Sequence, residues 1–151
     1  MNKTVLLSMT VLASALTTGA VIAQNETPIA ARQELMKGNL RGATSVIPMV
    51  RGSAPFEATK VDAAFAQWAE TAQKLPGLFP DNSKTGLKTR SSPKIWQAKA
   101  DFDAKAADFG KAVADNREKA RGSLDGLKVA VPAVSKTCDN CHEVYRLPKQ
   151  D

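Results

Sequence analysis

Apolar residues recur every three or four positions along four stretches of the chain, which is the spacing of amphipathic helices. No stretch shows sustained alternation of apolar and polar residues, so we expect essentially no β-sheet. Pro28 and Pro93 suit first helical positions, because each follows a residue that can cap a helix, Thr27 and Ser92. The helices are expected at residues 28–50, 57–75, 93–115 and 127–147. The pattern predicts an all-α fold, an antiparallel up-down-up-down four-helix bundle.

Proline and glycine mark the interruptions of this pattern. The longest connection covers residues 76–92 and is rich in proline, glycine, serine and asparagine. Residues 116–126 break the apolar spacing before the last helix. Pro48 is expected to kink or fray the end of the first helix, and Pro132 to bend the last helix or delay its start.

Residues 1–23 have the features of a cleaved secretory signal peptide. Lys3 gives a positive start, residues 5–16 are mostly apolar, and residues 21–23 form a cleavage signal of small and apolar residues. The apolar run is too short to span a bilayer, and no later segment is apolar enough to do so. We therefore expect export to the periplasm and one mature domain, residues 24–151.

The string Cys138-Asp139-Asn140-Cys141-His142 forms the pattern C-x-x-C-H, the attachment site of a c-type haem. Two thiols about one helical turn apart can each add to a vinyl group of one porphyrin. The histidine that follows can coordinate the iron. Three other readings are weaker. A zinc site needs a fourth ligand, a thioredoxin-like pair belongs in a βαβ unit, and a structural disulfide does not require the histidine.

The second axial ligand of such an iron has few candidates. His142 is the only histidine, so methionine is the next usual choice, and only Met36 and Met49 follow the signal peptide. On one helix they lie about 20 Å apart along the axis and point about 140° apart, so only one can serve. Met36 shares a helix face with Arg32, whose guanidinium would then lie near the haem propionates, whereas Met49 follows Pro48 at the helix end. Met36 is the expected distal ligand, with core filling as the alternative.

The formal net charge of +6 at pH 7 bears on partners. A modest positive surface favours docking to acidic redox proteins through electrostatic steering. The charge is too dispersed, and exposed aromatic residues are too few, to suggest nucleic acid. Lys136, Arg146 and Lys149 flank the haem motif and either steer an acidic partner or form a solvated face.

Several motifs together resemble the class II cytochromes c, the four-helix bundles typified by cytochrome c prime. The resemblance covers nearly all of the chain after the leader, and in that family the haem motif lies close to the carboxyl end. Its motifs here are Arg32-Gln33-x-x-Met36, Leu75-Pro76-x-x-Phe79, Pro93-Lys94-Ile95-Trp96 and Cys138-x-x-Cys141-His142-x-x-Tyr145-Arg146.

The resemblance also implies roles for single residues. It implies that Arg32 and Gln33 approach a propionate, that Phe79 packs near the haem and that Arg146 lies beside the proximal histidine. Tyr145 lies three residues after that histidine, so we expect it to pack against the haem environment. Family members occur as monomers and as homodimers joined through the first two helices, and both states remain open.

Three functions are compatible with these residues. The preferred one is a periplasmic monohaem electron carrier, not an enzyme, with His142 and Met36 on the two sides of the iron. The alternative, from the five-coordinate branch of the family, binds nitric oxide or carbon monoxide on an open distal side. A thiol-disulfide oxidoreductase would need Cys138 and Cys141 as free thiols. A peroxidase is weaker still, because no distal histidine exists to transfer protons.

Overall fold

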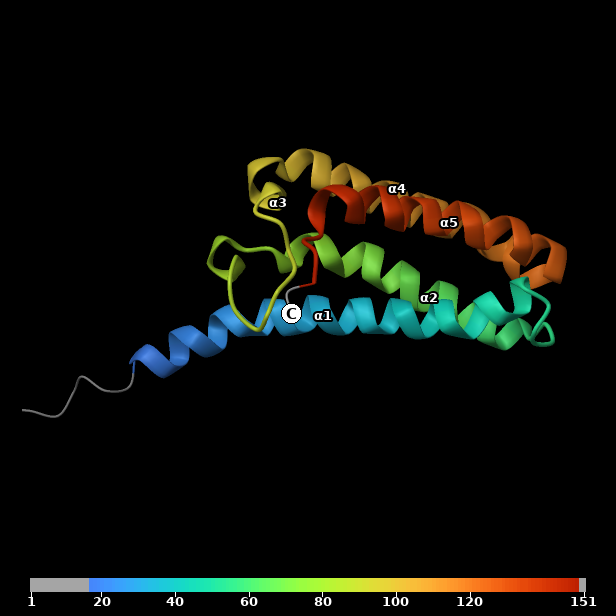
Figure 1. The fold of residues 1–151 in the computed structure, drawn as a ribbon, viewed down its shortest axis with the longest axis horizontal. Helices are drawn as coiled ribbons and strands as arrows, with labels where there is room; N and C mark the ends of the chain where they lie inside the picture. The colour runs from blue at the N-terminus through green and yellow to red at the C-terminus, as the bar shows by residue number, and fades with distance from the viewer. Residues whose placement is uncertain (1–16, 150–151) are drawn as a thin grey trace, which may run out of the picture.

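The computed structural model describes the backbone of residues 17–149 and the side chains of residues 27–149. Four long helices lie side by side in an elongated bundle (Figure 1). The only β-type pairing in this part of the chain is one isolated bridge between Ser91 and Arg146. The long helices are α1 (Thr17–Val50), α2 (Ala58–Lys74), α4 (Lys99–Gly122) and α5 (Leu124–Tyr145). The predicted all-α four-helix bundle is confirmed.

The order of the helices in space follows their order in the chain. Helix α1 packs on α2, α2 on α4 and α4 on α5, while α5 also contacts α1. In Figure 1 α1 runs along the lower edge and α2 returns beside it, with α4 and α5 above them. This is the up-down-up-down arrangement that short connections impose on neighbouring antiparallel helices.

Helix α2 agrees with the expected range to within one residue at each end. Its apolar stripe contains Val61, Phe65 and Trp68, which are all buried. The helix tightens into the 3₁₀ turn η1 (Leu75–Leu78), in which Pro76 occupies the first turn. A proline there leaves one backbone carbonyl without its helical partner, so a regular α-helix ends naturally at this point.

The expected start of the first helix at Pro28 is wrong. Helix α1 begins at Thr17, and Pro28 lies inside it. An internal proline removes one hydrogen bond but does not forbid a helix when the residues on both sides favour one. The predicted cleavage point after Ala23 therefore falls within α1. Most of the predicted signal peptide, residues 1–16, lies outside the described residues, so cleavage stays a prediction.

The third expected helix is divided in two. Short helix α3 (Lys94–Gln97) follows Ser92, whose hydroxyl accepts a hydrogen bond from the Lys94 amide at 3.2 Å. At Ala98 the backbone leaves the helical region, with φ −129° and ψ 51°, before α4 begins at Lys99. The capping function of Ser92 matches the expectation, whereas the break at Ala98 was not expected.

The interruption predicted at residues 116–126 is present but is much shorter than expected. Helix α4 continues to Gly122, and α5 starts at Leu124 after the single residue Ser123. The Ser123 hydroxyl accepts a hydrogen bond from the Gly126 amide at 3.0 Å and so caps α5. Polar residues of α4 in this region are good helix formers and continue the helix without an apolar stripe.

Two prolines that were expected to disturb helices lie inside α1 and α5. Pro132 lies inside α5 and does not delay its start, because the helix is already established eight residues earlier. Helix α1 extends past Pro48 to Val50, and the Pro48 carbonyl accepts hydrogen bonds from the Ser53 and Ala54 amides at 2.9 and 3.2 Å. These bonds close the end of α1 into the turn that leads to α2.

The buried residues fall into two groups. The larger, here called the far-end core, is mainly aliphatic and draws on all four long helices. The smaller, here called the aromatic cluster, lies toward the end of the bundle where α5 finishes and contains Leu75, Phe79, Ile95, Phe102 and Tyr145. The far-end core contains Val46, Met49, Val61, Ala64, Phe65, Trp68, Phe109, Val113, Ala120, Leu127, Ala130, Val131 and Val134.

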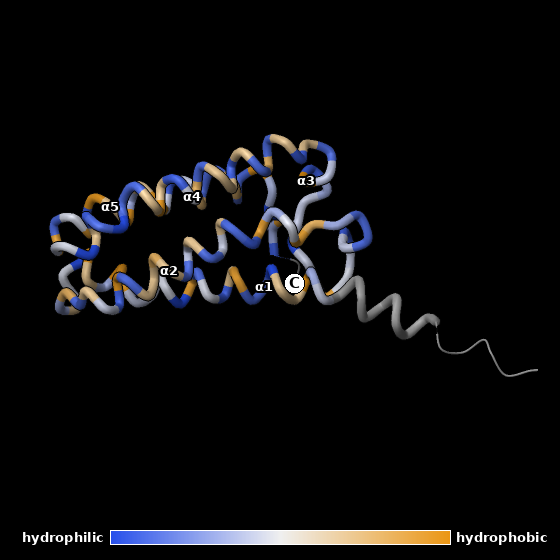
Figure 2. The backbone as a smooth tube through the Cα atoms, turned by 180° about the vertical axis from the view of Figure 1, so that it is seen from behind, coloured by the Kyte–Doolittle hydropathy of each residue, from blue (hydrophilic) through white to orange (hydrophobic). Residues whose placement is uncertain are grey.

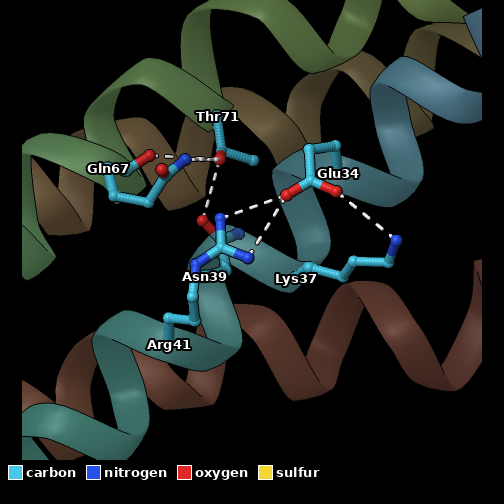
Figure 3. Close-up of polar contacts among 6 residues, drawn as sticks. All are labelled: Glu34, Lys37, Asn39, Arg41, Gln67 and Thr71. Carbon is cyan, nitrogen blue, oxygen red and sulfur yellow. Dashed lines mark hydrogen bonds and ion pairs between the residues drawn. The ribbon is translucent and has the colours of Figure 1, made fainter.

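Helices α1 and α2 are also joined by polar contacts (Figure 3). Thr71 is fully buried, and its hydroxyl donates to the Asn39 side-chain oxygen at 2.8 Å. Gln67 donates to the same hydroxyl at 3.3 Å. On the exposed side, Arg41 contacts Glu34 at 3.2 Å. The buried bonds set the register between the two helices, because a shift would leave buried polar atoms without partners.

Apolar positions recur at short intervals among hydrophilic ones along the long helices (Figure 2). This is the pattern of helices that bury one face and expose the other. Accordingly, no helix in the described part of the chain has the length and apolar character needed to span a bilayer.

Candidate haem site

The C-x-x-C-H residues occupy the last turns of α5. Cys138 and Cys141 are both half-buried and carry free thiols. Because they are three residues apart on a helix, their side chains lie on the same face. Cys138 packs against the far-end core and Cys141 against the aromatic cluster. The two thiols therefore lie where the two buried groups of the bundle meet.

The protonation of these residues follows from their burial. Burial raises the pKa of the Cys138 thiol to about 11, with a further contribution from the negative charge of Asp139. Burial also raises the pKa of Cys141. For His142, burial and the nearby positive charge of Arg146 lower the pKa. At neutral pH the site thus presents two thiols and a neutral imidazole, the form of histidine that can bind a metal.

His142 borders an open groove with a volume of about 380 Å³. Arg90 and Arg146 line this groove, together with the carboxylates of Asp139 and Glu143. The structure therefore places Arg146 beside the expected proximal histidine. The C-terminal tail is held there by the Leu147 amide, which donates to the Arg90 carbonyl at 2.8 Å.

The two candidate methionines lie in different parts of the bundle. Met36 is half-buried on α1 and packs against the aromatic cluster, the same cluster that Cys141 contacts from α5. Met49 is 1% exposed and belongs to the far-end core. Met36 thus shares its cluster with Cys141, which directly precedes His142, whereas Met49 shares the far-end core with Cys138.

Arg32 is buried beneath the long connection rather than displayed on the surface. Its Nη1 donates to the Leu78 carbonyl and the Ser83 hydroxyl, each at 3.0 Å. Its Nη2 donates to the Ser83 carbonyl at 2.7 Å and to the Thr89 hydroxyl at 3.1 Å. The Nε atom is buried without a hydrogen-bond partner. Burial lowers the pKa of Arg32 to about 10, and the guanidinium still remains charged at neutral pH.

Gln33, the next residue of α1, holds the same connection. Its side-chain amide donates to the Leu87 carbonyl at 2.9 Å. The resemblance implied that Arg32 and Gln33 approach a haem propionate. In the structure their hydrogen bonds fasten the connection to α1, and among the buried side-chain polar atoms of the described residues only Nε of Arg32 lacks a hydrogen-bond partner.

Aromatic rings link the connection to α4 and α5. The ring of Phe79 lies 4.7 Å from the ring of Phe102, which in turn lies 5.3 Å from that of Tyr145. The guanidinium of Arg32 lies 4.7 Å from the centre of the Phe79 ring, an arrangement favourable to a cation–π interaction. Phe79 and Tyr145, both singled out from the sequence, are thus brought together with Cys141 in one cluster.

Tyr145 fixes the attachment turn of α5 to the beginning of α4. Its hydroxyl donates to a carboxylate oxygen of Asp101 at 2.6 Å. This hydrogen bond raises the pKa of Tyr145 to about 12. Asp101 was not identified from the sequence, because an exposed aspartate in the first turn of a helix has an ordinary explanation as a favourable partner of the helix dipole.

Other residues of the site were also missed. Ser83 and Thr89 accept hydrogen bonds from Arg32 at 3.0 and 3.1 Å. These residues lie in a connection without apolar periodicity, so their positions in space leave no pattern in the sequence. The only available signal was the unusual density of serine and threonine in a segment that must face a buried arginine.

The residues present fit a covalently attached haem. The donor set on α5 consists of two free thiols and a neutral imidazole, and Met36 offers a thioether from α1. The unpartnered buried Nε of Arg32 is a donor that an anionic propionate would satisfy. A half-buried apolar environment is what a porphyrin ring requires on both faces.

Comparisons with known proteins agree with this site. The family model described as Cytochrome C' matches residues 27–146. Cytochrome c-556 of Rhodopseudomonas palustris is 43% identical over 136 residues, which are 87% of this chain and 89% of that protein. Cytochrome c' of the same organism is 34% identical over 134 residues, 87% of this chain and 88% of that protein.

The similarity extends to three dimensions. The structure of oxidised R. palustris cytochrome c556 matches with a TM-score of 0.73 at 41% identity, covering 83% of this chain and 99% of that one. With a family match over most of its length and relatives of this identity, the chain belongs to the class II cytochromes c, the Cytochrome C' family, whose cofactor is a covalently attached haem c.

Proposed function

We propose that the protein is a periplasmic electron carrier in which Cys138 and Cys141 bind the haem and His142 and Met36 ligate its iron. The observation that carries this proposal is the shared environment of Met36 and Cys141, which pack from α1 and α5 against one aromatic cluster. When bound, the haem supplies an iron that changes between the ferric and ferrous states.

The residues of the chain determine how such an iron behaves. The neutral imidazole of His142 and the thioether of Met36 supply no charge, and thioether ligation favours the ferrous state and raises the reduction potential. Phe79 and Phe102 are buried and give Cys141 and Met36 an apolar surrounding. Burial of this kind disfavours the additional positive charge of the ferric form.

The ligation is tested by optical spectroscopy of the oxidised holoprotein. We expect a low-spin spectrum with a methionine-to-iron charge-transfer band in the wild type. Met36→Leu should abolish the band, because leucine keeps the volume but lacks the sulfur. Met49→Leu is the matched control and should retain it. A high-spin wild-type spectrum, or rapid binding of carbon monoxide to the reduced protein, would favour the gas-binding alternative instead.

Export and attachment are tested by intact mass of the secreted protein. We expect a mass equal to residues 24–151 plus one haem, with no change in mass on treatment with a thiol reagent. A variant with Cys138→Ala and Cys141→Ala should lose covalent haem. Secreted wild type with the mass of the bare polypeptide would contradict the proposed attachment.

A further inference from the structure

The positive charge of the chain is concentrated in one segment. Residues 82–100 contain five lysine or arginine residues and no aspartate or glutamate, whereas the whole chain carries a net charge of +6. Lys84 contacts Asp81, and Lys99 contacts Asp103. The other three are Lys88, Arg90 and Lys94. Among residues 27–149 none of these three has a carboxylate within ion-pair distance.

An exposed leucine lies within this basic segment. Leu87 is 41% exposed and, like Lys88, adopts a left-handed backbone conformation, with φ 43° and 49° respectively. Two consecutive non-glycine residues in this region are uncommon. The conformation is held in place by the hydrogen bond from Gln33 to the Leu87 carbonyl. An apolar side chain is thus kept at the surface by a specific contact with α1, a feature that often accompanies a binding role.

The basic segment adjoins the candidate haem site. The Arg90 side chain donates to the Leu147 carbonyl at 2.9 Å, and Ser91 pairs with Arg146. Arg90 and Arg146 line the groove that contains His142. Figure 1 shows the connection and the C-terminal tail together at this end of the bundle. A partner that contacts the segment would therefore lie close to the attachment motif.

We propose that Leu87, Lys88, Arg90, Lys94 and Arg146, here called the loop face, dock an electron-transfer protein whose contact surface has carboxylates around an apolar centre. This inference rests on the proposed electron-carrier function. Opposite charges steer the two proteins together, and a small apolar contact excludes water at the centre. The carboxylates of Asp139 and Glu143 lie in the groove on α5 and would repel such a partner, which places the contact on the loop side of His142.

An anionic lipid surface is the competing occupant, and the structure favours a protein. Membrane attachment through an interfacial segment requires an extended apolar face, usually of an amphipathic helix. The loop face offers one exposed leucine on a backbone fixed by hydrogen bonds. Its rigid shape and its position beside the haem motif suit a protein partner that exchanges electrons.

The test uses the holoprotein and a gold electrode coated with a mixed monolayer of carboxylate- and methyl-terminated thiols. We expect the double variant Lys88→Gln, Lys94→Gln to bind this surface about tenfold more weakly at low salt. The control double variant Arg51→Gln, Lys119→Gln makes the same change of net charge elsewhere on the molecule. Its affinity for the monolayer should stay within about twofold of that of the wild type. Equal losses in both double variants would overturn the proposal, because binding would then follow net charge alone.

The role of the apolar side chain of Leu87 is tested by a second variant with its own control. Leu87→Ala should weaken binding to the same monolayer about threefold. Val129→Ala removes another exposed apolar side chain, on α5, and should leave binding unchanged. Binding to phosphatidylglycerol vesicles that exceeds binding to the monolayer, and that falls in the Lys88→Gln, Lys94→Gln variant, would assign the loop face to a membrane and overturn the protein partner.

The optical spectrum of each variant separates the two proposals. If the methionine-to-iron band is present and the paired variants bind equally, only the loop face is contradicted. If the band is absent while the paired variants still differ, only the methionine ligation is contradicted.

Discussion

The two ends of the bundle are held together by different means. The far-end core consists of thirteen buried residues from all four long helices, with no charged side chain among them. The aromatic cluster has five, of which three are aromatic; its Phe79 ring packs against the buried guanidinium of Arg32, and Cys141 and Met36 border the cluster. The far end is packed by apolar side chains, whereas the other end holds two free thiols and a buried arginine whose Nε has no hydrogen-bond partner. Stability and function therefore draw on separate sets of residues.

The largest expected effect is at the far end. Phe65 is fully buried, with its ring 4.9 Å from that of Trp68. Phe65→Ala should lower the free energy of unfolding by about 3–5 kcal/mol, because it leaves a cavity among close-packed residues. Chemical denaturation measures this loss. The oxidised spectrum should remain that of the wild type, and a changed spectrum would contradict the separation of the two ends.

At the other end, Arg32→Leu should lower the free energy of unfolding by about 3 kcal/mol, because it leaves buried carbonyl groups without hydrogen-bond donors. It should also release the connection from α1, so trypsin should cut after Lys84, Lys88 or Arg90 faster than in the wild type. Arg41→Leu is the control on the same helix. Arg41 is exposed and, within residues 27–149, pairs only with Glu34, so its loss should change stability by at most about 1 kcal/mol and leave proteolysis unaltered. Unchanged proteolysis in Arg32→Leu would argue against the fastening of the connection.

Gly126→Ala tests how closely α4 and α5 approach. An added Cβ would lie 2.0 Å from the Lys119 carbonyl oxygen, so the backbone must move. This movement should lower the free energy of unfolding by about 2 kcal/mol. Gly122→Ala, where an added Cβ meets nothing within 4 Å, should be neutral or slightly stabilising. Similar thermal midpoints for the two variants would show that the helix junction is looser than described.

The smallest expected effect is that of Tyr145→Phe, which removes the hydrogen bond to Asp101. It should lower the free energy of unfolding by about 1 kcal/mol at pH 8. The pKa of Tyr145 is raised to about 12 in the folded protein, above its ordinary value of 10.0. The folded state therefore holds this proton more tightly, and the contribution is lost as pH rises from 10 towards 12. Urea denaturation at several pH values should show the two proteins converging in stability over this range. If the difference in stability between the two proteins stayed constant over this pH range, the contribution of the Tyr145 proton would be contradicted.

Sequence periodicity predicted the helices best where one apolar stripe runs without interruption. Helix α2 is such a case, because Val61, Phe65 and Trp68 define a single buried face. The junction of α4 and α5 was predicted poorly, since residues 117–121 are mostly charged and only Ala120 among them is buried. Charged residues occur in exposed helices as well as in loops, so the local sequence pattern could not distinguish a helix from a loop here.

The candidate site was predictable to the extent that its chemistry is local. The spacing of Cys138, Cys141 and His142 is visible in the sequence alone. The hydrogen bonds of Arg32 are not visible there, because its partners lie 46 to 57 positions further along the chain. Nothing in the sequence of a loop records which helix residue the loop will contact. That contact depends on the packing of the whole bundle, and only the structure shows it.

The chain order of these groups bears on how the molecule is made. Among the described residues the partners of the Arg32 guanidinium lie before residue 90, whereas the two cysteines follow at positions 138 and 141. Synthesis proceeds from the amino end, so three of the four long helices leave the ribosome before the thiols do. The attachment motif is thus synthesised after the three helices that α5 joins in the bundle.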